Sequence, residues 1–189
     1  PATRIVALTV TEKAYGINRH AMTIAPDHVG IAHDLADPRH PTGVLGLLTE
    51  ALRCRRDAGV APFTCLCCDN LPENGIVLRA GVTDFARHID PALAGWIEQN
   101  VHFPSSMVDR ITPASTAHTY ETVRAMTGHD DTCAVETEPF SQWVIEDDFP
   151  TGRPAWEQAG VLMVDDVRPF EHMKLRMLNG SHSLIAYLG

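Results

Sequence analysis

The stretch "FTCLCCDN", residues 63–70, decides the fold class of this 189-residue chain. Its first six residues are apolar or small, as in a buried β-strand, and the chain turns polar at Asp69 and Asn70. Residues 4–11, "RIVALTVT", have the same character, and residues 44–59 between the two stretches have apolar side chains at helical spacing before a glycine. Strand, helix and strand in succession predict a βαβ unit, and therefore an α/β fold with a parallel sheet covered by helices.

The remaining chain alternates helical and extended patterns. Asp90 before Pro91 is a helix start signal, and residues 14–41, which hold three prolines, are expected to contain only short elements. Further helices are predicted in residues 71–89, 91–100 and 169–188. Residues 105–115 are predicted to form a short strand or turn, residues 133–149 one or two strands, and residues 160–167 one more strand.

Composition narrows the class of protein. The formal net charge of −9 and the absence of any Lys/Arg-rich block argue against a nucleic-acid partner. No apolar run approaches the roughly 20 residues that a membrane span needs, and the N-terminus does not resemble a signal peptide. Five cysteines, an odd number, argue against a disulfide framework and indicate a reducing, cytoplasmic setting. The chain opens without Met and ends within an apolar helical pattern, so we expect a fragment of a longer protein.

Polar residues follow both predicted strands of the βαβ unit. In a parallel α/β sheet, ligands bind beyond the carboxyl ends of the strands. Asn70 lies at that end of its strand, and Thr11 and Glu12 lie at that end of theirs. The plainer interpretation is that Asp69 and Asn70 only turn the chain, and this segment alone favours it.

The last predicted helix carries a group of polar residues. At about 100° per residue, Glu171, Lys174, Asn179 and His182 share an arc of roughly 140°. The opposite side is apolar as well, which predicts a helix buried on nearly all sides. Each polar residue alone is most simply a hydrogen-bonded core residue, but together they favour a functional site at least as strongly. Burial disfavours a charged lysine, so Lys174 is a candidate general base.

Five segments follow one another in the chain: "ALTVTEKAYG" (7–16), "CDNLPENG" (68–75), "FPSSMVDRITPA" (103–114), "EPFSQWVIED" (138–147) and "MKLRMLNGSHSLIAYLG" (173–189). In this order they resemble the polyol-specific long-chain dehydrogenases, which include the mannitol 2-dehydrogenases and the fructuronate reductases (D-mannonate oxidoreductases). The resemblance covers essentially the whole chain, and "KLRMLNGSHS" is slightly closer to the fructuronate reductases. It implies a zinc-independent enzyme that transfers hydride between NAD, or NADP, and a sugar alcohol or aldonate and its keto sugar.

The resemblance also implies roles for single residues. Lys174 matches the family's general base, and Asn70 and Asn179 match the two amides that donate to the reacting oxygen. His182 resembles a residue that holds substrate, and Glu171 resembles a proton-relay carboxylate.

Other expected contacts lie elsewhere in the chain. Val108 and Asp109 are expected to contact the polyol, and Thr11 and Glu12 to lie on the cofactor side. No metal is expected. Because no G-x-G-x-x-G element is present, residues 1–168 are expected to be the second half of a Rossmann-like dinucleotide-binding domain. Residues 169–189 would then be the first helix of an α-helical substrate-binding domain.

Two alternatives stay open. A metal-dependent hydrolase is suggested by ten histidines and 24 acidic residues, but there is no H-E-x-x-H. Cys65, Cys67 and Cys68 cannot all face one side of a strand. The second alternative is a truncated, non-catalytic fragment that keeps Lys174 and the two amides but binds no dinucleotide. Both NAD and NADP as cofactor, and both a polyol and a uronate as substrate, are compatible with the five segments.

Overall fold

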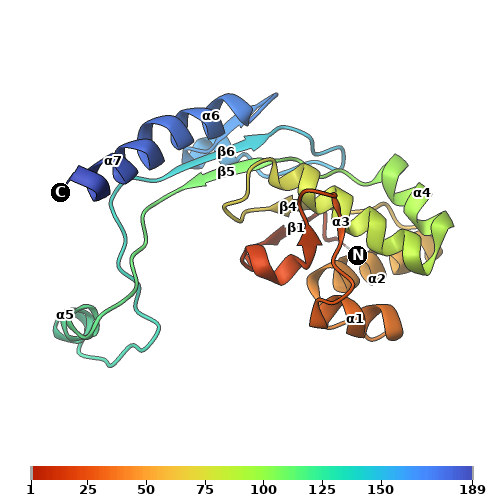
Figure 1. Cartoon of the computed structure of the whole chain (residues 1–189), viewed down its shortest axis with the longest axis horizontal. Helices are drawn as coiled ribbons and strands as arrows, with labels where there is room; N and C mark the ends of the chain where they lie inside the picture. Colours follow the sequence, from red (N-terminus) through yellow and green to blue (C-terminus); the bar gives the residue numbers. More distant parts are fainter. Residues whose placement is uncertain (1, 189) are drawn as a thin grey trace.

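A computed structural model describes residues 2–188, apart from the side chains of Leu178, Asn179, Ser181, His182, Ser183 and Ala186. Most helices gather around β1 and β4, β5 and β6 extend from this body beneath the last helix, and α5 projects on an arm (Figure 1). The elements are β1 (Ile5–Leu8), η1 (Glu12–Tyr15), β2 (Ile17–Asn18), β3 (Thr23–Ile24), α1 (Val29–Ala36), α2 (Val44–Asp57), β4 (Thr64–Cys67), α3 (Asn74–Ile89), α4 (Pro91–Asn100), β5 (Ser106–Asp109), α5 (Ala117–Thr127), β6 (Gln142–Glu146), η2 (Trp156–Ala159), β7 (Leu162–Val164), α6 (Arg168–Met173), η3 (Lys174–Asn179) and α7 (Gly180–Leu188).

The predicted βαβ unit is confirmed. β1 and β4 pair in parallel, from Ile5 opposite Thr64 to Leu8 opposite Cys67. Neighbouring residues of β4 face opposite sides: Cys65 belongs to the core formed with the helices, and Leu66 packs in a second cluster that includes Ile145. Both faces of β4 are therefore covered, which explains why its sequence is apolar throughout rather than alternating.

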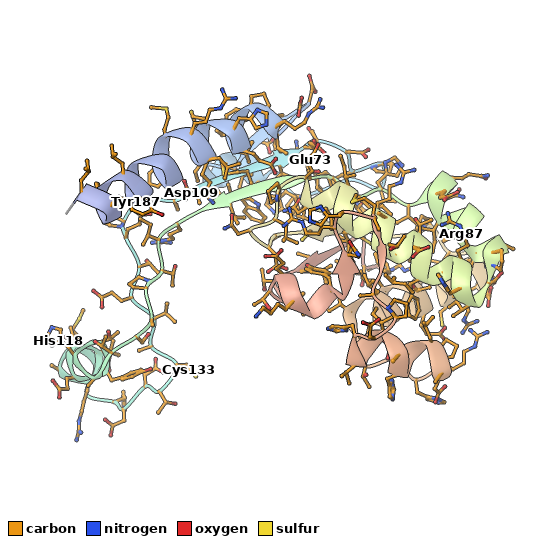
Figure 2. The ribbon with its side chains drawn as sticks, viewed as in Figure 1. Glu73, Arg87, Asp109, His118, Cys133 and Tyr187 are labelled. Atoms are coloured by element: carbon orange, nitrogen blue, oxygen red, sulfur yellow. The ribbon has the colours of Figure 1, made fainter. Side chains whose placement is uncertain are left out.

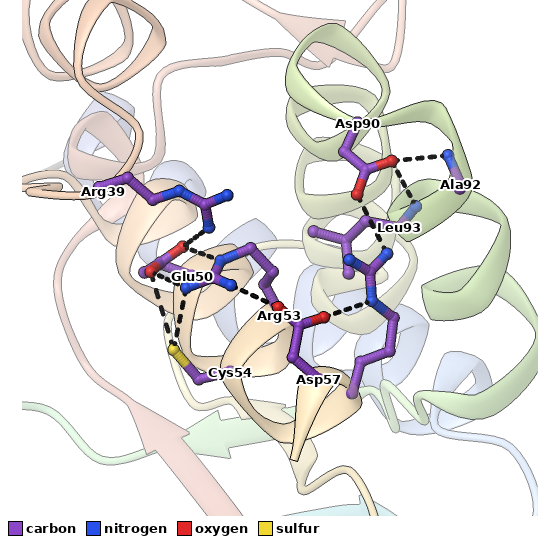
Figure 3. Close-up of polar contacts among 9 residues, drawn as sticks. Arg39, Glu50, Arg53, Cys54, Asp57, Asp90, Ala92 and Leu93 are labelled. Atoms are coloured by element: carbon purple, nitrogen blue, oxygen red, sulfur yellow. Dashed lines mark hydrogen bonds and ion pairs between the residues drawn. The ribbon is translucent and has the colours of Figure 1, made fainter. Parts of the chain in front are cut away.

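Helices α2 and α4 form where their sequences predict, although Leu47, expected on the buried face of α2, is 53% exposed. Leu45, Leu48 and Leu52 of α2 are buried at i, i+3 and i+7. Asp90 caps α4 by accepting hydrogen bonds from the backbone N–H groups of Ala92 (3.0 Å) and Leu93 (3.2 Å). Charged side chains of α2 form a series of ion pairs, and the last of these residues, Arg56, binds the Asp90 carboxylate at 3.1 Å (Figure 3). The cap thus also joins α2 to α4.

The second sheet is mixed rather than wholly parallel. β6 pairs with β7 in parallel, as expected, but β5 and β6 are antiparallel, with Asp109 opposite Gln142. The chain leaves the end of β5, runs out along the arm and returns beside the same end, so β6 must run in the reverse direction (Figure 1). Residues 133–149, predicted to form one or two strands, form one.

The arm contains the helix α5, which the sequence patterns did not predict. Thr116 and Thr119 form a capping box at its start, and Gly128 ends it with a left-handed backbone at φ 76°. Met126 is 80% exposed, and the single residue of α5 that is buried is the polar Thr119. Because this helix buries no apolar stripe, it leaves no helical periodicity in the sequence to recognise.

The last helix was expected to be buried, and this expectation is wrong for the described chain. Met177 is 69% exposed and Tyr187 is 90% exposed. The helix lies along β5 and β6, and no other element within residues 2–188 covers its outer side (Figure 1). Lys174–Asn179 also forms a π-helix rather than an α-helix, so the assumed 100° per residue does not hold there. No helix among these residues is both long enough and apolar enough to cross a membrane.

Candidate active site

Lys174 joins three segments that are distant in the sequence. Its Nζ donates to Asn70 Oδ1 at 3.1 Å and to the carbonyl oxygen of Val108 at 2.6 Å. The Asp109 carboxylate lies 3.7 Å from the same nitrogen, and the two side chains are only 13% and 12% exposed. Asp109 lies at the end of β5, beneath the C-terminal helix (Figure 2). The three oxygen atoms give the ammonium group partners in a half-buried position.

The π-helix places Lys174 at its first position. Such helices close i→i+5 hydrogen bonds, and Gly180 N accordingly donates to the Leu175 carbonyl. π-Segments are rare and occur often at functional sites. The backbone of Asn179 lies one π-turn beyond Lys174, but the side chains of Asn179 and His182 lie outside the described part of the structure.

Asn70 follows a firmly anchored turn. The Asp69 carboxylate accepts from the backbone N–H groups of Val10 (3.0 Å) and Thr11 (2.9 Å) and from the Tyr15 hydroxyl (2.6 Å), and so joins the carboxyl ends of β1 and β4. Burial and the hydrogen bond to Asp69 raise the pKa of Tyr15 well above its usual range, so its hydroxyl remains a donor. Asp69 was expected only to turn the chain, but in the structure its carboxylate holds the ends of β1 and β4 together.

Thr11 and Glu12, which are expected on the cofactor side, follow the carboxyl end of β1. Thr11 has φ 74° and ψ 152°, a backbone conformation that is strained for any residue with a side chain. Its N–H bond to Asp69 helps to hold this conformation. Glu12 is exposed and pairs with Arg19 at 3.0 Å, so its carboxylate is engaged on the surface.

Glu171 lines a cavity together with Lys174, but no described contact joins the two side chains. Its carboxylate accepts a 3.0 Å hydrogen bond from the backbone N–H of Glu73. Glu73 precedes α3 in a left-handed conformation, at φ 50°. Burial raises the pKa of Glu171, against the lowering effect of that hydrogen bond. The carboxyl group is therefore more easily protonated than an exposed glutamate.

Two cavities meet at Lys174 and Asn70. The smaller, of about 100 Å³, is also lined by Glu171 and by Val108. The larger, of about 470 Å³, is open to solvent and includes Asp109 and Trp143. A ligand in the larger cavity would therefore meet the lysine, the amide and the carboxylate together.

The positions of the described side chains do not support a metal-dependent hydrolase. Across residues 2–188, apart from the six side chains not described, no three His, Cys, Asp or Glu side chains are grouped to hold a metal ion. Cys65 and Cys67 are fully buried in the core, and burial raises the pKa of both thiols. They behave as small apolar residues, as an alternating strand predicts.

Comparison with known proteins matches two family models in succession. The mannitol dehydrogenase Rossmann domain matches residues 2–158, and the mannitol dehydrogenase C-terminal domain matches residues 166–189. The predicted division between residues 168 and 169 itself stays a prediction.

Individual relatives agree along the whole chain. A D-mannonate oxidoreductase of Escherichia coli K12 is 51% identical over 189 residues, which is 100% of this chain and 39% of the relative. A mannitol 2-dehydrogenase of Cereibacter sphaeroides is 49% identical, over 99% of this chain and 39% of its own length. A solved ternary complex of Pseudomonas fluorescens mannitol 2-dehydrogenase with NAD and D-mannitol has a TM-score of 0.88 at 46% identity, over 98% of this chain and 38% of that one.

The chain thus spans 39% of the length of the curated relatives it matches. The family match over residues 2–158 and the 0.88 TM-score confirm both the Rossmann-type α/β fold and the resemblance found in the sequence. The chain belongs to the mannitol dehydrogenase family.

Proposed function

We propose that the polypeptide carrying this chain is an NAD(P)-dependent oxidoreductase that interconverts a sugar alcohol or aldonate and its keto sugar. The observation that carries the proposal is the contact of Lys174 Nζ with Asn70, Val108 and Asp109 beside an open cavity. The relatives named for D-mannonate and mannitol support the substrate class. A solved relative that holds NAD and D-mannitol supports a small polyol and a nicotinamide cofactor.

We place the dinucleotide at the carboxyl ends of the parallel strands, where this class of sheet binds it. The carboxyl ends of the parallel strands β1 and β4 meet at Asp69, directly before Asn70. Thr11 and Glu12 lie at this edge and are the residues that we assign to the cofactor side. When bound, the nicotinamide accepts hydride from the alcohol or returns it to the ketone.

Lys174 moves the proton of the reaction. In its neutral form, Nζ takes the hydroxyl proton during oxidation and returns one during reduction. The resulting ammonium is held by the Val108 carbonyl, Asn70 Oδ1 and the Asp109 carboxylate. These acceptors stabilise the charge that the lysine acquires. No metal is required for this proton transfer, and we propose a zinc-independent reaction.

Two amides stabilise the reacting oxygen in this mechanism. Asn70 accepts from Lys174 through Oδ1, which directs that end of the amide to the lysine and makes the amino end the donor to substrate. Asn179 is the second donor by family resemblance. Donors fixed where charge develops are often the largest single catalytic term.

Further contacts complete the proposed site. Asp109 and Val108 border the substrate, and His182 holds it by family resemblance. Glu171 supplies the proton relay, because its carboxyl lines the small cavity beside Lys174 and burial raises its pKa.

A substrate screen tests the proposal. A polypeptide of full family length that contains this chain is assayed with NADH and NADPH against fructose, fructuronate and tagaturonate. We expect reduction of at least one keto sugar, and the same rate after exhaustive chelation and dialysis. No turnover with any pair would overturn the proposed function and favour a non-catalytic chain. Loss of activity on chelation, restored by zinc, would overturn the zinc-independent mechanism alone.

A further inference from the structure

The two strands that carry the site are not paired with each other. Within residues 2–188, β4 belongs to one sheet with β1, and β5 belongs to another with β6 and β7. A backbone hydrogen bond from Cys65 N to the His102 carbonyl, at 3.0 Å, links the segment before β5 to β4. Asn70 follows β4, whereas Val108 and Asp109 lie in β5, so the geometry around Lys174 depends on what sets the spacing of these strands.

Asn74 bridges the two strands at this point. Its side chain is 0% exposed. Its Nδ2 lies 3.1 Å from the Cys67 carbonyl, 3.0 Å from the Asp69 carbonyl and 2.8 Å from the Ser106 carbonyl. Its Oδ1 accepts from Ser106 N at 2.8 Å. The amide therefore exchanges both kinds of hydrogen bond with the start of β5, as a neighbouring strand would, while also donating to the end of β4.

The orientation of this amide follows from its partners. The backbone N–H of Ser106 can only donate, and the carbonyls of Cys67 and Asp69 can only accept. Only the orientation that directs Oδ1 toward Ser106 N and Nδ2 toward the carbonyl oxygens satisfies these partners. Ser106 Oγ strengthens the bridge by donating to the same Cys67 carbonyl at 2.6 Å.

Gly75 allows Asn74 to approach so closely. A Cβ atom at this position would lie 2.3 Å from the Phe103 carbonyl oxygen and 2.7 Å from Ser105 N. Only glycine lets the start of α3 rest directly on the backbone that leads into β5. The Asn-Gly pair of "CDNLPENG" is thus a docking element, although its sequence reads as a turn.

We propose that Asn74 is a positioning residue for the oxidoreductase reaction: it fixes the spacing between Asn70 and Val108, and so holds Lys174 in its productive position. This inference rests on the proposed function. The Asp69 carbonyl that Asn74 binds directly precedes Asn70, and Ser106 lies two residues before Val108. A small shift at either attachment is therefore transmitted to a partner of Lys174. Misplacement of catalytic groups by about 1 Å can cost on the order of 100-fold in rate.

Kinetics of Asn74→Ala and Asn74→Asp in the full-length polypeptide test this role. Asn74→Asp keeps an acceptor for Ser106 N but sets carboxylate oxygens against the carbonyls, so we expect no rescue. Both variants should lower kcat about 100-fold while changing the KM for the dinucleotide less than about threefold. Ser106→Ala, which removes the hydroxyl that donates to the Cys67 carbonyl and leaves the amide of Asn74 in place, is the milder variant if the others fail to fold, and should lower kcat in the same selective way.

The matched control is Asp34→Ala. Asp34 is also 0% exposed and accepts from the backbone N–H groups of Thr42 and Gly43 at 2.8 Å each, and none of its contacts reaches the site. It should lower the melting temperature without a selective loss of kcat. If Asn74 and Ser106 variants lose stability but keep native kcat, as this control does, the positioning role is wrong.

A double mutant and a crystal structure separate the two proposals. Adding Asn74→Ala to Lys174→Ala should lower kcat by a clearly smaller factor than Asn74→Ala does in the wild type, because the placement of Lys174 no longer matters and only that of Asn70 does. Full additivity would contradict the proposal. In crystals of Asn74→Ala, Lys174 Nζ should no longer reach both Asn70 Oδ1 and the Val108 carbonyl within 3.5 Å. If both contacts persist unchanged, the positioning role fails, whether or not the wild type proves to be an oxidoreductase.

Discussion

The ammonium nitrogen of Lys174 donates to the Val108 carbonyl oxygen at 2.6 Å, a contact that joins the π-helix to β5. The same nitrogen reaches Asn70, in the turn that follows β4, at 3.1 Å. One side chain thus links two strands that belong to separate sheets. This relationship underlies the predictions for the site.

The two ends of the Asn70 amide have different partners in the proposed mechanism. Asn70→Asp keeps an oxygen for Lys174 but removes the N–H donor to the reacting oxygen. We expect it to lower kcat about 10²–10³-fold, as the loss of one oxyanion donor does elsewhere. Asn70→Ala, which removes both ends, should be at least as slow. Steady-state kinetics decide the point: near-native kcat in Asn70→Asp would show that the amide serves only to hold the lysine.

The Glu171 carboxyl should make stability depend on pH. Burial raises its pKa in the folded protein above the ordinary value of 4.5. The stability that it contributes is therefore complete below that value and is lost as pH rises through the folded pKa. Glu171→Gln keeps an acceptor for Glu73 N but does not titrate. Relative to this variant, the wild type should lose unfolding free energy as pH rises from about 4 to 8.

Urea denaturation at several pH values measures this difference. A gap between wild type and Glu171→Gln that stays constant with pH, or that favours the wild type increasingly at high pH, would contradict the assignment.

The Asp90 cap should show the opposite pH dependence. The Leu93 backbone hydrogen bond, with Arg56, lowers the pKa of Asp90 below its ordinary 3.8. Its stabilisation is therefore present above that value and lost as pH falls through the folded pKa. Asp90→Ala should cost about 1 kcal/mol at neutral pH, and less in acid. Asp90→Asn keeps a capping acceptor without the charge, and its smaller cost should not vary with pH. A neutral-pH cost below about 0.3 kcal/mol for Asp90→Ala would show that the cap is unimportant.

The sequence predicted the βαβ unit because both of its strands are buried and its helix has a clear apolar stripe. The arm helix α5 was not predicted, because its one buried residue is the polar Thr119 and its sequence therefore has no buried apolar stripe at helical spacing. The outer face of the last helix was expected to be covered, since its residues are apolar, but Tyr187 is 90% exposed in the described chain. Periodicity reports which residues are apolar, and it does not report whether the partner lies within the same chain.

The site was predicted in part. The proximity of Asn70 and Lys174 follows from a strand end and from family resemblance, and the structure places the two side chains in contact. The roles assigned to them stay predictions. Asn74 was not recognised, because the Asn-Gly pair with which α3 begins has the composition of a turn. Its amide binds the backbone of Ser106, 32 residues further along, and sequence patterns do not show such a distant partner.

The most direct test of the central claim is the turnover of Lys174→Ala in the full-length polypeptide. A positioned general base contributes about 10²–10⁴-fold, so kcat should fall by that factor while dinucleotide affinity, measured by NADH titration, stays nearly unchanged. The rise of alcohol oxidation with pH, which reports one deprotonation, should vanish, and small primary amines should restore part of the rate. Near-native kcat with an unchanged pH profile would show that Lys174 is only structural and would contradict the mechanism.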